Sequence, residues 1–244
     1  MPMNVSALSG KRIVVTAGST RAYIDAVRFI SNYSSGRLGS LIAAECLRRG
    51  SEVRFLHGEG TLTPRIVAER GEAALSAEEL SRLETIKIES VPHLAETLEH
   101  QLERLPADAV VHAMAVLDYI PDPAQVSTRK EKSDKQRWTI ELVPTPKIID
   151  LVKKTCPSTL LVGFKLEVGL DREALIASAK NLMERSGADL AVANDMADVQ
   201  GNAYQAILLQ RNPDGTISET PVKGRGETAL LLCDRLGEML AGRA

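Results

Sequence analysis

The fold is decided by residues 11–60, KRIVVTAGSTRAYIDAVRFISNYSSGRLGSLIAAECLRRGSEVRFLHGEG. The β-branched run Arg12–Thr16 predicts a strand, and Leu38–Arg49 carries apolar residues at helical spacing before Gly50 ends the pattern. A second strand is predicted at Ser51–Leu56. Strand, helix and strand in this order form a βαβ crossover with parallel strands, and open α/β sheets bind ligands at the carboxyl ends of such strands.

The connection between the first strand and the helix is about twenty residues long, whereas βα loops usually have about two to six. It begins with Gly18, Ser19 and Thr20 and ends in Asn32-Tyr33-Ser34-Ser35-Gly36-Arg37-Leu38-Gly39. Hydroxyls and backbone N–H groups at a helix N-terminus favour phosphate, so we predict an anion cradle there. The alternative is that Ser34 or Ser35 serves only as a helix N-cap.

The rest of the sequence continues the alternation of strands and helices. Strands are predicted at 86–90, 108–114, 138–143, 159–164 and 189–193, helices at 91–105, 146–154, 171–185 and 227–240, and a hairpin at 204–210 and 217–222. We therefore expect an α/β, Rossmann-like, doubly wound, mainly parallel sheet with a flap or hairpin excursion. It forms one domain, 1–244, with an N-terminal lead-in at 1–10, a surface excursion at 61–84 and a flexible lysine loop at 120–137.

Composition narrows the function classes. The net charge of −2 and an aromatic content of 3% argue against a nucleic-acid surface, while 44% hydrophobic residues suffice for a core. No apolar run of about 18 residues and no signal-peptide pattern occur, so we expect no membrane association. Cys46, Cys156 and Cys233 are scattered, which is typical of reduced thiols in a cytoplasmic protein.

Several familiar signatures are missing. The sequence has no G-x-x-x-x-G-K-[ST], no G-x-G-x-x-G after the first strand and no Tyr-x-x-x-Lys, which makes a NAD(P)-binding oxidoreductase the alternative rather than the first interpretation. It also lacks G-x-S-x-G and clustered Cys and His residues, so a serine nucleophile and a zinc site are not expected. His112, inside a predicted central strand, is interpreted as a core histidine.

The strand-end loops instead carry amides, hydroxyls, lysines and a carboxylate suited to Mg²⁺. They are Gly18, Ser19, Thr20, Asn32, Ser34, Ser35, Asp118, Lys130, Lys132, Phe164, Lys165, Asn194 and Asp195. Such a set is typical of nucleotidyl or phosphoryl transfer, which depends on positioning and charge neutralisation. The run Arg129–Lys135 has a second interpretation as a solvated charge run, but it follows a central strand, from which a mobile loop can close over phosphates.

The ordered motifs of the chain resemble the phosphopantothenate–cysteine ligase family. The resemblance rests on Val15-Thr16-Ala17-Gly18-Ser19-Thr20 and on the continuous run from Ile24 to Gly39. It continues through Ala115-Val116-Leu117-Asp118-Tyr119, the lysine loop, 142–146, Gly163-Phe164-Lys165-Leu166-Glu167 and Ala193-Asn194-Asp195. The motifs are specific, and they cover nearly the whole chain.

The resemblance implies a function in coenzyme A biosynthesis. A nucleoside triphosphate, CTP or ATP, activates the carboxylate of 4′-phosphopantothenate as an acyl-nucleotide with Mg²⁺ present, and L-cysteine then displaces the nucleotide. The family pattern makes Asn32 and Lys130 catalytic, with Asn32 handling the acyl-nucleotide and Lys130 beginning the triphosphate loop. Asp118 matches the aspartate of an Ala-Asp-Tyr element and is our candidate Mg²⁺ ligand, and Phe164 matches the residue beside the nucleotide.

The remaining site residues follow from their places in these motifs. We assign the nucleotide to Gly18, Ser19, Thr20, Ser34, Ser35, Gly36, Asp118, Lys132, Phe164 and Lys165, and the acyl substrate to Asn32, Arg37 and Asn194. The family also implies a homodimer. Because the chain begins close to the first ligase strand, we expect a ligase without the decarboxylase domain that precedes it in many bacteria.

The chain departs from the family pattern in four places. Ser19 stands where a second glycine is usual, and Leu117 stands where alanine is common. Lys130-Glu131-Lys132-Ser133 is a thinner version of a lysine-rich loop, and the segment after Asn194-Asp195 is short, without a clear Asp-x-Asn element in Gly201-Asn202-Ala203-Tyr204. A paralogue acting on a different carboxylate, or a nucleotide-binding protein without this activity, therefore stays open beside the ligase.

Overall fold

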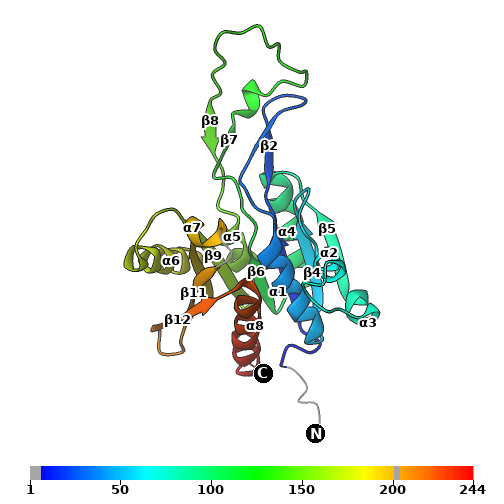
Figure 1. The fold of residues 1–244 in the computed structure, drawn as a ribbon, viewed down its shortest axis with the longest axis vertical. Helices are drawn as coiled ribbons and strands as arrows, with labels where there is room; N and C mark the ends of the chain where they lie inside the picture. Colours follow the sequence, from blue (N-terminus) through cyan, green and yellow to red (C-terminus); the bar gives the residue numbers. More distant parts are fainter. Residues whose placement is uncertain (1–6, 201–203, 244) are drawn as a thin grey trace.

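The computed structural model describes residues 7–200 and 204–243, and within them an eight-stranded sheet organises the fold (Figure 1). Residues 1–6 of the predicted lead-in lie outside the described residues. The strand order is β12-β11-β10-β9-β6-β1-β4-β5. The strands are β1 (Arg12–Ala17), β4 (Glu52–His57), β5 (Leu83–Lys87), β6 (Ala109–His112), β9 (Leu160–Glu167), β10 (Leu190–Asp195), β11 (Gln205–Arg211) and β12 (Ile217–Lys223).

Strand pairing confirms the doubly wound, mainly parallel prediction. β1 pairs in parallel with β4 on one side and with β6 on the other, and β9 and β10 continue the parallel ladder. β11 and β12 close one edge as an antiparallel hairpin, as predicted. The chain moves outward from β1 in one direction and from β6 in the other, so the topological switch point lies between these two strands, where open sheets bind ligands.

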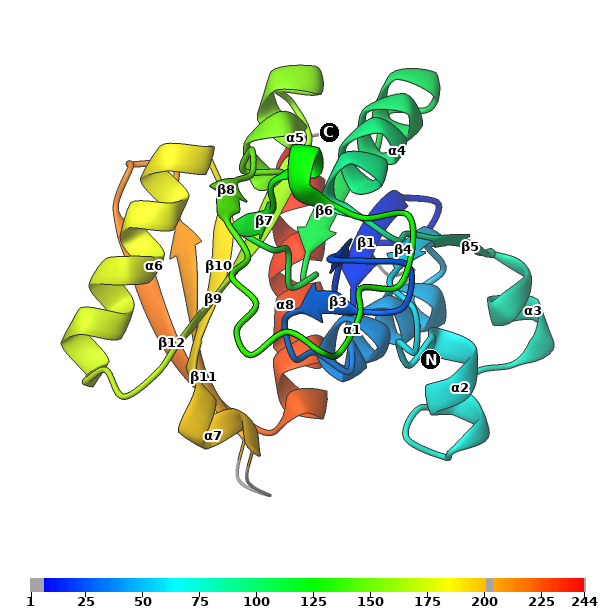
Figure 2. The same ribbon diagram turned by 90° about the horizontal axis from the view of Figure 1, so that it is seen from above.

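Helices cover both faces of the sheet (Figure 2). Buried side chains of α1 and α8 pack on one face, and those of α4, α5 and α6 pack on the other. The helices are α1 (Arg37–Arg48), α2 (Pro64–Glu69), α3 (Ala77–Ser81), α4 (Val91–Arg104), α5 (Ile149–Thr155), α6 (Arg172–Ser186), α7 (Met196–Gln200) and α8 (Arg225–Ala241), with a short 3₁₀ helix η1 at Pro123–Gln125. Local signals set several ends: Asp171 caps α6, and Gly187 ends it in the left-handed conformation.

Two small hairpins stand above the carboxyl edge of the sheet (Figure 1). One pairs β2 (Arg21–Tyr23) with β3 (Phe29–Ser31), and the other pairs β7 (Tyr119–Pro121) with β8 (Leu142–Pro144). We call residues 20–31 and 119–144 together the arm. The arm corresponds to the predicted flap. The β2–β3 hairpin lies within the long connection between β1 and α1.

Three sequence-based boundaries were wrong. The predicted strand 138–143 is only the short β8, because Trp138 lies in an irregular segment outside it. The predicted strand 86–90 is β5 at Leu83–Lys87, an edge strand whose half-exposed residues give a weak apolar pattern. The excursion 61–84 holds α2, which the sequence pattern did not indicate, and α3, and its last two residues belong to the sheet.

Candidate active site

Two adjoining cavities open at the carboxyl ends of β6, β9 and β10. The first, of about 470 Å³, is called the helix-end cavity because the start of α1 forms one wall. Its other walls come from the segment after β6, from β9 and β10, and from residues near the start of α8, and its lining includes Ser34, Ser35, Gly36, Arg37, Phe164, Asn194, Met196, Tyr204 and Arg225. It therefore collects predicted site residues from three separate parts of the sequence.

The second cavity, of about 440 Å³, is called the loop cavity. It shares Tyr33, Met114, Ala115 and Phe164 with the helix-end cavity, so the two are continuous along the sheet edge. Its lining also includes Asn32, Val116, Asp118, Lys147, Lys165 and Arg185. A ligand with two ends can therefore occupy both cavities at once.

The combined lining is rich in positive charge. Among the described residues, the two linings contain a single carboxylate, that of Asp118, and five cationic side chains, those of Arg37, Lys147, Lys165, Arg185 and Arg225. Several of these cations have acidic partners outside the cavities: the Nζ atom of Lys165 lies 3.1 Å from a carboxylate oxygen of Glu167, for example. A concave surface with this excess of cations concentrates anionic ligands.

The start of α1 has the chemistry of an anion cradle. Its N-cap is Gly36, at φ 72°, and neither a capping side chain nor an acidic residue in the first turn occurs there. The hydroxyl of Ser34 accepts a hydrogen bond from the N–H of Gly36 at 3.3 Å, and that of Ser35 accepts one from the N–H of Arg37 at 3.4 Å. Neither serine is the N-cap, so that alternative was wrong, and the positive end of the helix dipole faces the cavity.

Asn32 lies at the rim of the loop cavity with an exposed side chain. Its Nδ2 atom donates to the carbonyl oxygen of Val116 at 3.1 Å, which fixes the orientation of the amide. The described non-glycine residues have no positive φ, so Asn32 is not there to accommodate a left-handed turn. With Nδ2 engaged, Oδ1 remains as an acceptor for an incoming amine.

Asp118 lies at the foot of the arm, with its side chain 63% exposed. Its Oδ1 atom is 2.5 Å from the Nζ atom of Lys147, a cation that the sequence analysis did not assign to the site. No group of three or more His, Cys, Asp or Glu side chains suited to a metal occurs in the described part of the chain. A metal ion at Asp118 would therefore depend on ligand oxygens and water for its other bonds.

Phe164, Lys165 and Asn194 all meet at this site, as predicted. Phe164 and Lys165 lie on β9 and Asn194 on β10, and parallel register places Asn194 beside Leu166. Lys165 and Ser178 both hydrogen bond the carboxylate of Glu167, and together they lower its pKa. Glu167 therefore holds the lysine at the mouth of the cavity.

Gly18, Ser19 and Thr20 are not brought into either lining. Thr20 is fully buried, and its hydroxyl accepts from the N–H of Leu117 at 3.1 Å. A Cβ on Gly18 would lie 1.9 Å from the hydroxyl oxygen of Thr61, so this glycine permits close packing beneath the cradle. Ser19 accepts a hydrogen bond from Ser31. These three residues support the loop in this structure, and the prediction that they touch nucleotide has no support from its geometry.

The excursion after β4 contributes to the site, which the sequence analysis did not foresee. Glu72, which follows α2, lies with its carboxylate oxygen 2.7 Å from Nε of Arg37 and so orients that predicted substrate ligand. Met196, Tyr204 and Arg225 were also missed: Met196 directly follows the Ala193-Asn194-Asp195 motif but lies outside it, and Tyr204 and Arg225 come later in the chain. The guanidinium carbon of Arg225 lies 4.8 Å from the centre of the Tyr204 ring.

The lysine loop lies on the arm, above the sheet edge (Figure 1). Lys130 and Lys132 are exposed and do not line either cavity. The loop is not without contacts, however, because Glu131, which lies between the two lysines, is hydrogen bonded to the β2–β3 hairpin. The expectation of a segment with few contacts therefore holds for the two lysine side chains and fails for the backbone between them.

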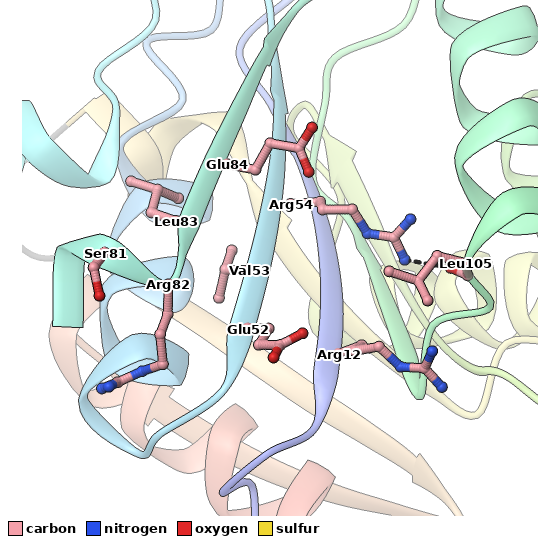
Figure 3. A pocket seen from close by; sticks show the side chains of 9 residues that line it. All are labelled: Arg12, Glu52, Val53, Arg54, Ser81, Arg82, Leu83, Glu84 and Leu105. Atoms are coloured by element: carbon pink, nitrogen blue, oxygen red, sulfur yellow. Dashed lines mark hydrogen bonds between the residues drawn. The ribbon is translucent and has the colours of Figure 1, made fainter. Parts of the chain in front are cut away.

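Two other features are accounted for without a ligand, although His112 also lines the loop cavity. His112 is buried, with Nδ1 2.9 Å from the hydroxyl of Thr16, and burial lowers its pKa to about 4, in agreement with the core interpretation. A separate cavity of about 290 Å³ beside β4 and β5 is drawn in Figure 3. Its buried Arg54 donates to carbonyl oxygens of Gln101 and Leu105, so this cation is already satisfied by the end of α4.

Comparison with known proteins decides the family. The profile of the DNA/pantothenate metabolism flavoprotein C-terminal domain matches residues 8–239. The chain belongs to this family. A coenzyme A biosynthesis bifunctional protein CoaBC from Thermococcus kodakarensis is 37% identical over 239 residues, a match that covers 98% of this chain and 54% of the relative. The chain thus spans about half the length of the curated relatives that it matches.

Solved structures of the family have the same fold. The crystal structure of the DNA/pantothenate metabolism flavoprotein from Streptococcus pneumoniae is 26% identical with a TM-score of 0.79, and the match covers 94% of this chain and 100% of that one. The C-terminal domain of a CoaBC protein is 27% identical with a TM-score of 0.69, covering 97% and 99%. The family match and these structures confirm the family resemblance and the Rossmann-like fold class. Among the described residues, no helix is long and apolar enough to span a bilayer.

Proposed function

We propose that this chain is a phosphopantothenate–cysteine ligase of coenzyme A biosynthesis. The observation that carries the proposal is the pair of continuous cavities at the switch point, with five lining cations and an α1 N-terminus that lacks a side-chain cap. Such a site suits a triphosphate and a second anionic substrate together. The 37% identity to a protein named for coenzyme A biosynthesis supports the choice of acid.

In the proposed binding mode the phosphates lie on the cradle. Ser34, Ser35 and Gly36 offer hydroxyls and backbone N–H groups at the helix end, and Arg37 adds a guanidinium. Phe164 and Asn194 face the same space from the sheet and suit the nucleoside. This binding mode differs from the assignment made from the sequence, in which Arg37 and Asn194 bind the acyl substrate and Lys165 binds the nucleotide, because Arg37 and Asn194 line the helix-end cavity and Lys165 lines the loop cavity. The acyl substrate occupies the loop cavity, where Asn32 and Lys165 face it. Lys130 and Lys132 approach the phosphates when the arm closes.

The chemistry requires positioning more than covalent help. An oxygen of the substrate carboxylate attacks the α-phosphorus of CTP or ATP, the bond from that phosphorus to the bridging oxygen breaks, and pyrophosphate leaves. The cationic lining offsets the repulsion between carboxylate and triphosphate. The amine of L-cysteine then attacks the acyl carbon and releases the nucleoside monophosphate, while Oδ1 of Asn32 accepts a hydrogen bond from that amine.

The residues present fit a magnesium ion bound in part by the substrate. Among the described residues, Asp118 is the one carboxylate that lines either cavity, and Mg²⁺ in nucleotide sites is commonly held by one or two carboxylates together with phosphate oxygens and water. Asp118 would have to exchange Lys147 for the ion. When bound, Mg²⁺ would neutralise phosphate charge. The base preference, CTP or ATP, is part of the proposal and is left to the assay below.

The proposal includes a homodimer in the cytoplasm. The arm carries exposed apolar side chains, among them Val27 and Tyr119, which favour burial against a second protein surface. None of the three cysteines forms a disulfide in the described chain, although the sulfur atoms of Cys46 and Cys233 lie 3.6 Å apart, and free thiols are typical of a reducing compartment.

Pyrophosphate release tests the function. Purified protein is incubated with Mg²⁺, 4′-phosphopantothenate, L-cysteine and either CTP or ATP. In parallel reactions, related carboxylic acids replace 4′-phosphopantothenate. We expect pyrophosphate with 4′-phosphopantothenate and one preferred nucleotide, and a rate lowered by orders of magnitude in Lys130→Gln with an unchanged fold. No pyrophosphate with any nucleotide, together with tight NADPH binding, would support the oxidoreductase instead. Release with another acid alone would identify a paralogue.

A further inference from the structure

Asp25 is a buried carboxylate at the tip of the arm, where most neighbours are exposed. It lies in the turn between β2 and β3, and its side chain is completely inaccessible to solvent. Oδ1 accepts hydrogen bonds from the N–H of Val27 at 2.9 Å and from the N–H of Arg28 at 2.7 Å. This oxygen therefore organises the hairpin turn itself.

The other carboxylate oxygen of Asp25 connects the hairpin to the lysine loop. Oδ2 accepts a hydrogen bond from the N–H of Glu131 at 3.1 Å and another from Nη1 of Arg28 at 2.5 Å. The same Nη1 donates to the carbonyl oxygen of Glu131 at 3.4 Å. Asp25 and Arg28 thus hold both backbone polar groups of the residue that lies between Lys130 and Lys132.

A single aromatic side chain completes this contact. The guanidinium carbon of Arg28 lies 5.2 Å from the centre of the Trp138 ring, and Nζ of Lys135 lies 5.8 Å from the same centre. Lys135 also pairs with the carboxylate of Glu131 at 2.7 Å. Two segments more than one hundred residues apart in the sequence therefore form one contiguous polar and aromatic cluster.

Asp25 is charged under the conditions of the proposed reaction. Burial favours its neutral form, but three backbone N–H donors and the guanidinium of Arg28 outweigh burial and lower its pKa to about 2. A buried carboxylate held by four donors is tied to its partners, because separation would leave a charge without hydrogen bonds.

We propose that Asp25 is a positioning residue that fastens the Lys130–Lys132 segment to the β2–β3 hairpin, so that both halves of the arm move as one body over the two cavities. The effect on catalysis rests on the proposed function; the fastening itself does not. Ordering the loop in advance removes much of the entropy that would otherwise be lost when the lysines close on the phosphates in the transition state.

The Asp25→Asn variant separates the two oxygens. The amide keeps one oxygen for the turn N–H groups of Val27 and Arg28, but it presents an NH₂ group where Glu131 and Arg28 both donate. The fastening is therefore lost while the turn is kept. Asp134→Asn is the matched control, because Asp134 is an exposed carboxylate on the same loop.

Trp138 reports on the loop without any substrate. It is the only tryptophan of the chain, so the fluorescence anisotropy and acrylamide quenching of the protein measure this segment alone. In Asp25→Asn we expect the anisotropy to fall and quenching to rise, with unchanged far-ultraviolet circular dichroism. Wild-type anisotropy and quenching in a folded Asp25→Asn protein would overturn the proposal.

Arg28 provides a second variant in case Asp25→Asn fails to fold. Arg28→Met removes the bridge from Asp25 to Glu131 but leaves both carboxylate oxygens available to the backbone, and Arg28→Lys keeps a cation at this position. We expect the loop to loosen in Arg28→Met and to be partly restored in Arg28→Lys. Equal anisotropy in wild type, Arg28→Met and Arg28→Lys would also contradict the proposal.

Kinetics distinguish positioning from a merely structural contribution. We expect pyrophosphate formation in Asp25→Asn to fall about tenfold or more in kcat, since ordering even one residue costs free energy of that size, while the affinity of the cavities for nucleotide stays close to wild type. Equal losses in Asp134→Asn would refute a specific contribution of Asp25. If wild-type protein releases no pyrophosphate, the proposed function fails, and the fluorescence result still decides whether Asp25 fastens the loop.

Discussion

At the scale of single residues, His112 is held neutral beside a site that is rich in cations. It borders the loop cavity, yet it is buried in β6 and hydrogen bonded to Thr16. Burial disfavours the imidazolium and lowers the pKa of His112 from 6.5 to about 4. In the unfolded chain the histidine regains its ordinary pKa, so between these two values the unfolded state binds more protons than the folded state.

This difference in proton binding predicts acid sensitivity. As the pH falls from about 6.5 to about 4, the free energy of unfolding should decrease by up to about 3 kcal/mol from this group alone. Urea unfolding at several pH values measures the slope, and His112→Gln should flatten it. His100→Gln serves as the control, because His100 is exposed on α4. An unchanged slope in His112→Gln would assign the acid sensitivity to other groups.

Asn32 yields a prediction about the second half of the reaction. Asn32→Asp cannot donate to the carbonyl of Val116 and adds a negative charge at the rim of the loop cavity. Activation relies on the cradle and the cations, so pyrophosphate and acyl-nucleotide should still form, whereas cysteine addition should stall. Mass spectrometry of a quenched reaction should then show acyl-nucleotide accumulating. Asn212→Asp, in the distant β11–β12 turn, should yield the cysteine adduct normally; a normal adduct yield from Asn32→Asp would remove the assigned role.

Single residues also show where sequence reasoning reaches its limit. The side chains around Ser34 and those of β9 were placed at the site because strand ends and helix starts are local signals. Gly18 also follows a strand end, but it lacks a side chain because Thr61 occupies that space. The position of Thr61 depends on how the surface excursion 61–84 packs, which the sequence pattern does not show. Lys147 was missed because its distance to Asp118 follows from tertiary structure alone.

At the scale of elements, the cradle depends on how closely α1 approaches the sheet. A Cβ on Gly39, in the first turn of α1, would lie 2.8 Å from the Cβ of Ala17 in β1 and 3.5 Å from that of Ala113. Real Cβ atoms cannot approach to the shorter distance, so a larger residue must push the helix start outward. The glycine therefore sets the position of the Ser34–Gly36 segment relative to the cavity.

Gly39→Ala should separate the effect of close packing between α1 and the sheet from the effect of helix propensity. We expect a loss of stability of about 1–3 kcal/mol from overpacking and weaker binding of nucleotide, measured by urea unfolding and by calorimetric titration with CTP or ATP. Gly226→Ala, at the start of α8, meets no atom within 4 Å and should leave stability unchanged or raise it. If both variants match wild type in stability and binding, close packing of α1 does not set the cradle.

Element types were more predictable than their ends. The prediction placed α4, α6 and α8 within about two residues of their observed bounds, because Ser90 caps α4, Asp171 and Gly187 delimit α6, and α8 has an apolar face. The short β7–β8 pairing has no such local signal. The faces of β7 and β8 are only partly buried, so burial alone specifies their register weakly, and we infer that packing against the β2–β3 hairpin helps to set it.

At the scale of the whole molecule, the parallel sheet was predictable because its central strands are continuous apolar runs. The complete lining of the cavities was not. The helix-end cavity is closed by Met196, Tyr204 and Arg225, which come from the last third of the chain and carry no motif. Only the folded order of β9, β10 and α8 brings them opposite α1.

The exposed apolar side chains of the arm lead to a prediction about assembly. Val27 and Tyr119 are each 57% exposed, and Phe29 and Leu142 are 42% and 46% exposed on the same arm. Large apolar side chains gathered on a projecting element favour association, since burying them removes apolar area from water. Sedimentation velocity should therefore show a homodimer that Val27→Asp and Tyr119→Asp weaken.

The control for this experiment lies away from the arm. Val168 is 74% exposed in the segment after β9, and Val168→Asp should leave the dimer intact because the same change in polarity occurs outside the contact. Each variant is compared over a range of protein concentrations, so that a shift in the dimer dissociation constant is separated from unfolding. Sedimentation of Val27→Asp and Tyr119→Asp as wild-type dimers would place the interface on another surface, and a monomeric wild-type protein would refute the assembly itself.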